Sequence, residues 1–177
     1  ARRMRSLVEK LLELARADGG VLEPARTRLD WAQETNEALL PFEPLCFEKG
    51  LVLDTRLDAG IFVRGDAALL QQLAAILLDN ACKYSSPGTV VRVVLKRRGK
   101  RRAVLSVANW GQPIPAKELA NIFKRFYRMD AARSQSEGHG LGLSIAQQIV
   151  RRHGGKIWAE SENGQNTFYA ELPSTVK

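Results

Sequence analysis

Three polar side chains near the end of one apolar helical segment are spaced so that together they could hold a nucleotide. Asn80, Lys83 and Tyr84 belong to the run Leu77–Ser85, LLDNACKYS, and their spacing places them on one face of a helix. An amide oxygen suits Mg²⁺, an ammonium group reaches phosphate oxygens, and a phenol packs on a base or bonds a phosphate. A core helix with an ordinary polar end has the same spacing, so the rest of the chain must decide between these interpretations.

A second candidate is the glycine-rich segment Gly138–Ser144, GHGLGLS, which runs into an expected helix over Ile145–Arg152. Glycines before a helix let backbone N–H groups converge on an anion at the helix N-terminus. The segment lacks the preceding strand and the later acidic residue of a dinucleotide fold, and the chain contains no GxxxxGKS or GxxxxGKT sequence. His139 is expected to be a loop residue rather than a metal ligand or phosphate acceptor.

Two further segments combine polar and aromatic residues with glycine or proline. Asn109–Pro115, NWGQPIP, ends an expected strand, and a polar residue followed closely by glycine lets a side chain and a bare backbone approach a planar ligand. A proline-rich loop without a ligand is the alternative. Glu118–Phe123 is predicted to be a short helix that leads into the aromatic pair Phe126 and Tyr127, and the polar stretch Met129–Glu137 follows.

The composition predicts one globular domain that favours anionic ligands. The chain has 177 residues, is 45% hydrophobic and carries a formal charge of +8, which allows a substantial core. Its densest basic run, Lys96–Arg102, has no interleaved aromatic residues and lies between two expected strands. We therefore interpret this run as a solvated hairpin turn and disfavour nucleic-acid binding.

The cysteines, the histidines and the lengths of the apolar runs argue against several classes of site. Cys46 and Cys82 fit no CxxC or metal spacing, which indicates a reducing compartment and burial. Two histidines are too few for a histidine-based metal site. No apolar run reaches membrane-spanning length and Ala1–Lys10 contains no signal-peptide core, so the chain as given is expected to be soluble.

Hydrophobic periodicity and turn residues predict an α+β fold. The expected elements are a helix at Arg2–Ala17, a strand at Ala25–Leu29, a helix at Trp31–Phe47, a hairpin of Leu51–Leu57 with Ile61–Val63, a long helix from Ala67, a hairpin of Val90–Leu95 with Ala103–Ala108, and closing strands at Lys156–Ala159 and Thr167–Leu172. Asp30 and Asp66 are the expected N-caps, and Pro41 and Pro44 are expected to break or kink the second helix. This order predicts a two-layer α/β sandwich with a mostly antiparallel sheet.

These segments, in this order, resemble the catalytic ATP-binding domain of sensor histidine kinases from bacterial two-component systems. Leu77–Ser85 resembles the N box of that family, Asn109–Pro115 its first glycine box, and Ile122–Arg128, IFKRFYR, its F box. Gly138–Leu143, GHGLGL, resembles the second glycine box. The segment from Arg3 to Gly19, RMRSLVEKLLELARADG, resembles the end of the second helix of the dimerisation and phosphoacceptor domain.

The resemblance implies a GHKL-type ATP-binding fold, in which helices cover one face of a mixed sheet. It divides the chain into residues 1–20, the end of the dimerisation helix and a hinge, and residues 21–177, the catalytic ATP-binding domain.

The implied ligands are ATP and Mg²⁺. Asn80 and Lys83 would be the catalytic residues, Asn80 as the metal ligand and Lys83 as a phosphate contact. Asn109 would accept from the adenine amino group, and Gly111 would let the ring approach. The other implied nucleotide-binding residues are Tyr84, Ile114, Phe123, Arg128, Gly138, His139, Gly140, Leu141, Gly142 and Leu143. The ATP lid would be Arg128–Glu137.

Three positions depart from the family pattern. Asn109 stands where the family usually has aspartate, so the base would lose a charge-assisted hydrogen bond and bind more weakly. Pro113 replaces the second glycine of the first glycine box, and Ile76 stands where the N box often has another asparagine. These changes keep a second hypothesis open, in which the domain is a degenerate nucleotide-binding or interaction module.

Nothing in the chain resembles the H box, the segment that carries the phosphoacceptor histidine. Phosphoryl transfer depends on a positioned acceptor, so we expect this chain to bind ATP without phosphorylating itself. The expected whole protein is a homodimeric, membrane-anchored sensor with this domain in the cytoplasm. It would pass the γ-phosphoryl group to its own histidine and then to an aspartate of a response regulator. An anti-sigma-type serine kinase would share the fold, but it would not need the N-terminal helix.

Overall fold

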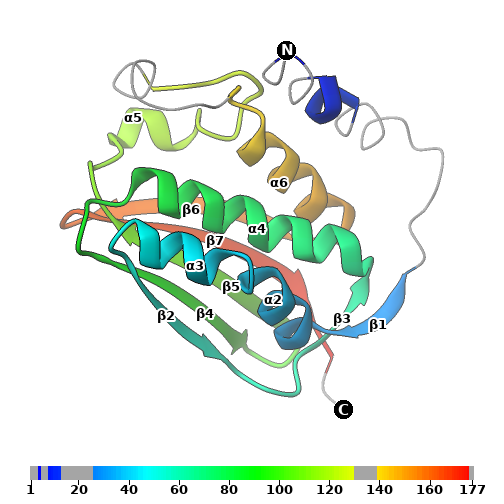
Figure 1. Ribbon diagram of the computed structural model, residues 1–177. Coiled ribbons are helices and arrows are strands. Elements are labelled where there is room, and N and C mark those ends of the chain that lie inside the picture. The colour runs from blue at the N-terminus through cyan, green and yellow to red at the C-terminus, as the bar shows by residue number, and fades with distance from the viewer. Residues whose placement is uncertain (1–3, 5–7, 13–25, 130–138, 176–177) are drawn as a thin grey trace.

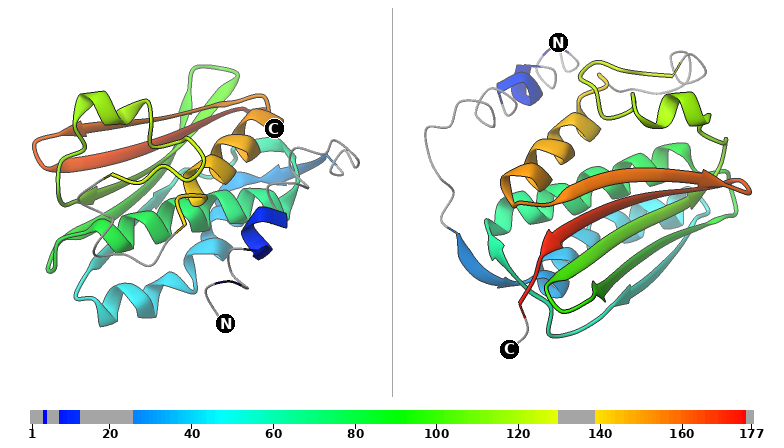
Figure 2. Two further views of the ribbon diagram at one scale, coloured as in Figure 1. Left: turned by 90° about the horizontal axis from the view of Figure 1, so that it is seen from above. Right: turned by 180° about the vertical axis from the view of Figure 1, so that it is seen from behind.

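The computed structural model describes residues 4, 8–12, 26–129 and 139–175. Its main sheet has five strands in the order β2-β4-β5-β7-β6, and helices cover one face of it (Figure 1). The strands of this sheet are β2 Val52–Leu57, β4 Val90–Arg98, β5 Arg102–Trp110, β6 Lys156–Glu162 and β7 Gln165–Pro173. The helices are α2 Trp31–Leu39, α3 Phe42–Glu48, α4 Ala67–Tyr84, α5 Ala116–Leu119 and α6 Gly142–Arg152. Figure 2 shows the two layers from above and from behind, and the predicted α+β sandwich is therefore confirmed.

The sheet is mixed, as expected, with mostly antiparallel pairing. The β4–β5, β5–β7 and β6–β7 pairs are antiparallel, whereas β2 and β4 are parallel. A second sheet of two antiparallel strands joins β1, Thr27–Asp30, to β3, Phe62–Gly65. The predicted hairpin across Lys96–Arg102 is confirmed, because β4 and β5 pair from Arg92↔Ala108 to Arg98↔Arg102.

The predicted hairpin of residues 51–57 with residues 61–63 is wrong. Local alternation identified both strands, but β3 leaves the main sheet to pair with β1, and β2 instead pairs with β4. The reason lies in the connection that follows β3. Helix α4 crosses the sheet and returns the chain beside β2, and a connection of this kind produces a parallel pair.

The expected helix at residues 31–47 is divided into α2 and α3 at Leu40 and Pro41. Proline in the middle of a helix would remove a backbone hydrogen bond, and here Pro41 becomes the residue before α3. Asp30 caps α2 as predicted, since its carboxylate accepts from the backbone N–H groups of Ala32 at 3.0 Å and Gln33 at 3.3 Å. Asp66 caps α4 in the same way, through the N–H of Leu69.

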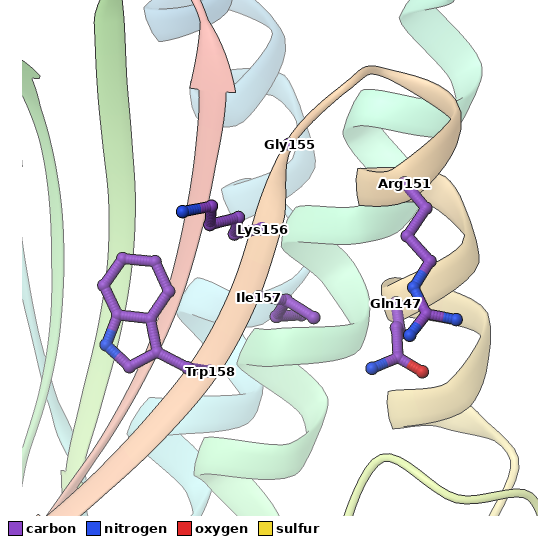
Figure 3. A pocket seen from close by; sticks show the side chains of 6 residues that line it. All are labelled: Gln147, Arg151, Gly155, Lys156, Ile157 and Trp158. Atoms are coloured by element: carbon purple, nitrogen blue, oxygen red, sulfur yellow. The ribbon is translucent and has the colours of Figure 1, made fainter.

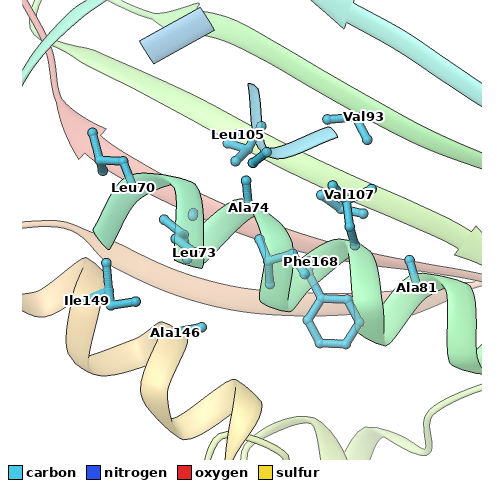
Figure 4. Packing of buried hydrophobic residues seen from close by; sticks show 14 of the residues in the cluster. Leu70, Leu73, Ala74, Ala81, Val93, Leu105, Val107, Ala146, Ile149 and Phe168 are labelled. Carbon is cyan, nitrogen blue, oxygen red and sulfur yellow. The ribbon is translucent and has the colours of Figure 1, made fainter. Parts of the chain in front are cut away.

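Helix α4 is the centre of the core, between α2 and α6 (Figure 1) and against β5. Figure 4 shows its buried residues between the sheet and Ala146 and Ile149 of α6. Its buried face consists of Leu70, Leu73, Ala74, Leu77, Leu78, Ala81 and Cys82. The opposing core residues of the sheet include Val91, Val93, Leu95, Leu105, Val107 and Phe168. Close packing of this face fixes the rotation of α4, and the polar residues at its C-terminal end are fixed with it.

Two further helical segments were expected, one near the N-terminus and one after Pro115. Residues 4 and 8–12 are helical, with Met4, Val8, Leu11 and Leu12 exposed, while the rest of the expected first helix lies outside the described residues. The short helix expected at residues 118–123 is instead α5, Ala116–Leu119, followed by turns, so its predicted bounds are wrong. Among the described helices, none has the length and apolar character needed to cross a membrane.

Candidate nucleotide site

The polar residues that end α4 are more exposed than its buried stripe. Asn80 is half-buried, and the side chains of Lys83 and Tyr84 are exposed. Lys83 Nζ lies 2.7 Å from Asp79 Oδ2, in an ion pair between residues four apart on the helix. The structure therefore brings the three predicted residues together on one side, and it adds Asp79 as the present partner of the lysine.

The first glycine segment meets the end of α4 at Gly111. A Cβ at this position would collide with the carbonyl oxygen of Tyr84, and the neighbouring Trp110 carbonyl accepts from the N–H of Ser86 at 2.8 Å. Glycine is therefore required here for close backbone packing. This is a structural reason that the sequence did not reveal, and the proposed approach of a base to Gly111 stays a prediction.

Asn109, at the end of β5, is almost completely buried, with 1% of its surface exposed. Its Nδ2 group has no hydrogen-bond partner within the described part of the chain. Buried polar groups are nearly always paired. A buried amide donor without a partner, two residues before Gly111, is therefore a candidate contact for a bound ligand.

A hydrogen-bond network that the sequence did not indicate holds the loop after Asn109. Asn166 on β7 donates from Nδ2 to the Gln112 carbonyl at 2.9 Å, and its Oδ1 accepts from the Ser161 hydroxyl at 2.6 Å. Ser161 Oγ in turn accepts from the N–H of Ile114 at 3.0 Å. The network ties residues 112–114 to the β6–β7 hairpin, so the loop is positioned by strands that follow it by about fifty residues in the sequence.

The second glycine segment lies against the F-box segment. The Phe126 N–H donates to the Gly140 carbonyl at 2.9 Å. Gly140 has a φ of +69°, and a Cβ there would lie 2.8 Å from the Tyr127 carbonyl oxygen. Both facts require glycine at this position. Gly142 begins α6, where a Cβ would lie 3.5 Å from Cγ2 of Ile76 on α4.

The other predicted residues are divided between the core and the rim of the site. Phe123 is buried and contacts Phe168 edge to face, with ring centroids 6.3 Å apart. Leu141 is buried, while Leu143 and Ile114 pack partly buried against the core. The half-buried residues His139 and Arg128 flank the segment of residues 130–138. Gly138 and most of the expected lid, Arg128–Glu137, lie outside the described residues.

The oxygen donors at the end of α4 suit a hard cation that is coordinated mainly by the phosphates of a bound nucleotide. No group of three or more histidine, cysteine, aspartate or glutamate side chains is clustered for a metal within residues 4, 8–12, 26–129 and 139–175. The half-buried Asn80 supplies a neutral amide oxygen, and Mg²⁺ commonly takes one or two protein oxygens together with phosphate and water. The residues present are therefore compatible with Mg²⁺ that arrives with a nucleotide.

A surface hollow of about 450 Å³ lies elsewhere, between α6 and the edge strand β6 (Figure 3). Its lining consists of Gln147, Arg151, Gly155, Lys156, Ile157 and Trp158. Figure 3 shows Gln147 and Arg151 on α6, across the hollow from Ile157, with Lys156 and Trp158 turned away. None of these residues is a predicted site residue, so we do not assign the nucleotide to this hollow.

Comparison with known proteins identifies the type of domain. Residues 65–176 match the family described as histidine kinase-, DNA gyrase B- and HSP90-like ATPases. The chain is 33% identical over 172 residues to the sensor protein DltS of Streptococcus agalactiae, covering 97% of this chain and 43% of DltS. It is 37% identical over 180 residues to the sensor histidine kinase TrcS of Mycobacterium tuberculosis, covering 98% and 34%. The chain thus spans less than half the length of these curated relatives.

Solved structures show the same domain. The mycobacterial sensor histidine kinase MprB matches with a TM-score of 0.74 and 26% identity, covering 86% of this chain and 99% of that one. Full-length ShkA in complex with AMPPNP matches with a TM-score of 0.84 and 25% identity, covering 97% of this chain and 36% of that one.

Proposed function

The chain belongs to the family of histidine kinase-, DNA gyrase B- and HSP90-like ATPases, and we propose that it holds Mg-ATP for γ-phosphoryl transfer to a histidine. It is a catalytic ATP-binding domain of the sensor histidine kinase type. The acceptor histidine would belong to the dimerisation and phosphoacceptor domain of the same protein. From there the phosphoryl group would pass to an aspartate of a response regulator.

One observation supports this proposal most directly. Two glycine segments that are far apart in the sequence contact α4 at two positions that are eight residues apart on the helix. Gly111 packs on Tyr84, and Gly142 packs on Ile76. Eight residues of α-helix span about 12 Å, a length comparable to that between the base and the terminal phosphate of ATP. Asn80 lies midway. The base would lie at the Asn109–Gly111 end, and the phosphates would lie at the Gly140–Gly142 end, near the N-terminus of α6.

Asn80 and Lys83 are the polar groups of α4 that we assign to Mg²⁺ and phosphate. The Asn80 amide oxygen would hold the metal, which would neutralise phosphate charge during transfer. Lys83 would exchange its present partner, Asp79, for a phosphate oxygen. An ion pair between partly exposed side chains is worth at most about 1 kcal/mol, so it offers little resistance to this exchange.

The wider assembly is part of the same proposal. The relatives DltS and TrcS are named as sensors, and histidine kinase ThkA has been solved in complex with the response regulator TrrA. We propose that the intact protein is a homodimer anchored in a membrane, with this domain on its cytoplasmic side. Residues 1–20 would be the end of the dimerisation helix, and residues 21–177 the catalytic domain.

The proposal is tested by calorimetric titration of the whole chain with ATP and ADP, each in Mg²⁺ and in EDTA. We expect saturable binding at one site that Mg²⁺ strengthens. Asn80→Ala should lose the strengthening by Mg²⁺ while it keeps its fold. The matched control is Asn36→Ala, which makes the same change at an exposed position of α2, and it should bind like the unchanged chain.

Two results would overturn the proposal. Unchanged Mg²⁺ dependence in Asn80→Ala would remove the assigned metal ligand. Absence of binding at millimolar nucleotide would favour a degenerate interaction module, in which Ile76, Asn109 and Pro113 have disabled the site. Phosphoryl transfer itself is tested with labelled ATP and a purified fragment that carries the phosphoacceptor histidine of a sensor histidine kinase, and labelling of that histidine is expected.

A further inference from the structure

The buried amide of Asn109 has a free donor where the proposed nucleotide base would lie. Only 1% of this residue is exposed, and Nδ2 makes no hydrogen bond within the described ranges. Its cross-strand neighbour on β7, Asn166, is buried to a similar degree but bonds both Gln112 and Ser161. The unpaired donor is therefore a property of Asn109 itself rather than of buried asparagines in this sheet.

Asn109 is also next to the position where glycine replaces a side chain. A Cβ on Gly111 would lie 3.4 Å from Asn109 Nδ2. The amide donor and the Tyr84 carbonyl oxygen both border this position, yet Asn109 Nδ2 makes no hydrogen bond within the described residues. A ligand that reaches this place must satisfy this donor, because a desolvated amide group that stays unpaired weakens binding.

A carboxamide and a carboxylate differ in what they can pair with. The carboxamide presents a donor beside an acceptor, and the two exchange places when the group turns about its last bond, whereas an ionised carboxylate only accepts. Adenine presents a 6-amino donor beside the N1 acceptor. A 6-oxo purine, such as hypoxanthine or guanine, presents a 6-oxo acceptor beside an N1–H donor. An amide therefore matches both edges, with one orientation for each.

We propose that Asn109 makes the base site accept 6-oxo purine nucleotides as well as adenine nucleotides. The inference rests on the proposed function, which places the 6-position of the base against this residue. With aspartate at position 109, the 6-oxo group would face an acceptor-only carboxylate, and adenine would be favoured. The asparagine is thus the specificity-determining residue, and it broadens the substrate class instead of only weakening the site.

The probe is inosine triphosphate, which differs from ATP only at the 6-position and the N1 hydrogen. Dissociation constants for both are measured by calorimetry on the whole chain with Mg²⁺, and again on Asn109→Asp. We expect the unchanged chain to bind the two nucleotides within about tenfold of each other, and Asn109→Asp to raise the ratio in favour of ATP by at least about tenfold. Asn36→Asp adds the same charge on the exposed face of α2 and should leave the ratio unchanged.

The possible results separate the two proposals. If the unchanged chain binds ATP and rejects inosine triphosphate, the inference is overturned and the proposed function stands. If it binds neither nucleotide, the proposed function is overturned, and the inference with it. The ratio for the unchanged chain decides the question even if Asn109→Asp fails to fold, which circular dichroism would show.

Discussion

The imidazole of His153 accepts a hydrogen bond at Nε2 from the backbone N–H of Asp66, over 3.2 Å. Its other nitrogen, Nδ1, lies 2.7 Å from the carbonyl oxygen of Ile149 and donates to it. One neutral histidine thereby joins the C-terminal end of α6 to the N-terminal end of α4. These are the two helices that carry Gly142 and Asn80, and the ring joins the ends of the helices opposite to those residues.

Stability should fall as the solution is acidified through this histidine. Burial lowers the pKa of His153 below its ordinary value of 6.5, against a smaller raising effect of the Ile149 carbonyl. A depressed pKa means that the unfolded chain takes up the proton first. The stability contributed by His153 is therefore present above pH 6.5 and is lost as the pH falls through the lower folded value. Urea unfolding at a series of pH values between 7.5 and 5 should show the decrease.

Two variants assign this pH dependence to one residue. His153→Gln should flatten the dependence between pH 6.5 and 5, because it removes the group that titrates there. His139→Gln changes the other histidine of the chain and should leave the dependence in place. The pKa of the Asp54 carboxyl is lowered by its hydrogen bond from Arg92, so its effect appears below pH 3.8 and does not overlap. A dependence that survives in His153→Gln would contradict the prediction.

The sequence was sufficient for several features that neighbouring residues determine. The β4–β5 hairpin was predictable because alternating residues flank a turn at Gly99, whose φ is +68°. The caps Asp30 and Asp66 were predictable because a capping carboxylate serves backbone N–H groups within three residues of it. The partner of β2 was not predictable in this way. It is determined by the crossover through α4, which brings Val90 beside Val52 from 38 positions along the chain.

The residues of the candidate site divide in the same way, into those that sequence spacing suggests and those that only strand pairing brings together. Helical spacing brought Asn80, Lys83 and Tyr84 forward as candidates, the other motifs in the chain were needed to support them, and all three lie in the last turns of α4. Ser161 and Asn166 were not recognisable, because polar residues near a predicted β-turn are ordinary. Their function as supports of residues 112–114 depends on the antiparallel register of β5 with β7, in which Asn109 faces Asn166. Sequence spacing contains no information about that register.

Removing the Asn166 amide should weaken nucleotide binding more than it weakens the fold. Asn166→Ala leaves the Gln112 carbonyl and the Ser161 hydroxyl without their partner, and loss of a buried hydrogen-bond partner costs about 1–3 kcal/mol. The loop beside Asn109 would lose its position, so we expect the Kd for ATP to rise about tenfold or more. Calorimetry measures the binding, and thermal melting measures the fold. Binding equal to that of the Asn36→Ala control would contradict a positioning function.

Gly111→Ala and Gly142→Ala should have opposite effects although the change is the same. At Gly111 the methyl group would collide with the Tyr84 carbonyl oxygen, which is backbone and cannot turn aside. We expect a loss of about 1–3 kcal/mol in stability, as overpacking typically causes, together with loss of ATP binding. At Gly142 the methyl group would meet Ile76 at 3.5 Å, an ordinary contact, and alanine favours the helix. That variant should fold at least as stably, as urea titration would show.

The thiols of Cys46 and Cys82 should react only when the domain unfolds. The two sulfur atoms lie 3.4 Å apart as free, buried cysteines on α3 and α4. Burial, with a smaller effect of the Cys46 hydrogen bond, raises the pKa of Cys82 from 9.0 to about 12. The reactive thiolate is therefore scarce at pH 8 in the folded chain, whereas both thiols are accessible in denaturant. A chromogenic disulfide reagent should label two thiols in guanidinium and almost none in the native chain.

Nucleotide provides the decisive comparison for this labelling, because Cys82 lies on α4 between Asn80 and Lys83. A ligand that binds only the folded state lowers the unfolded population by the factor 1 + [L]/Kd. When labelling follows unfolding, Mg-ATP at 100 times its Kd should slow the reaction about 100-fold. Asn80→Ala should reduce this protection at the same nucleotide concentration. Rapid labelling of the native chain, or slow labelling that nucleotide does not change, would show that the thiols are reached without unfolding α4.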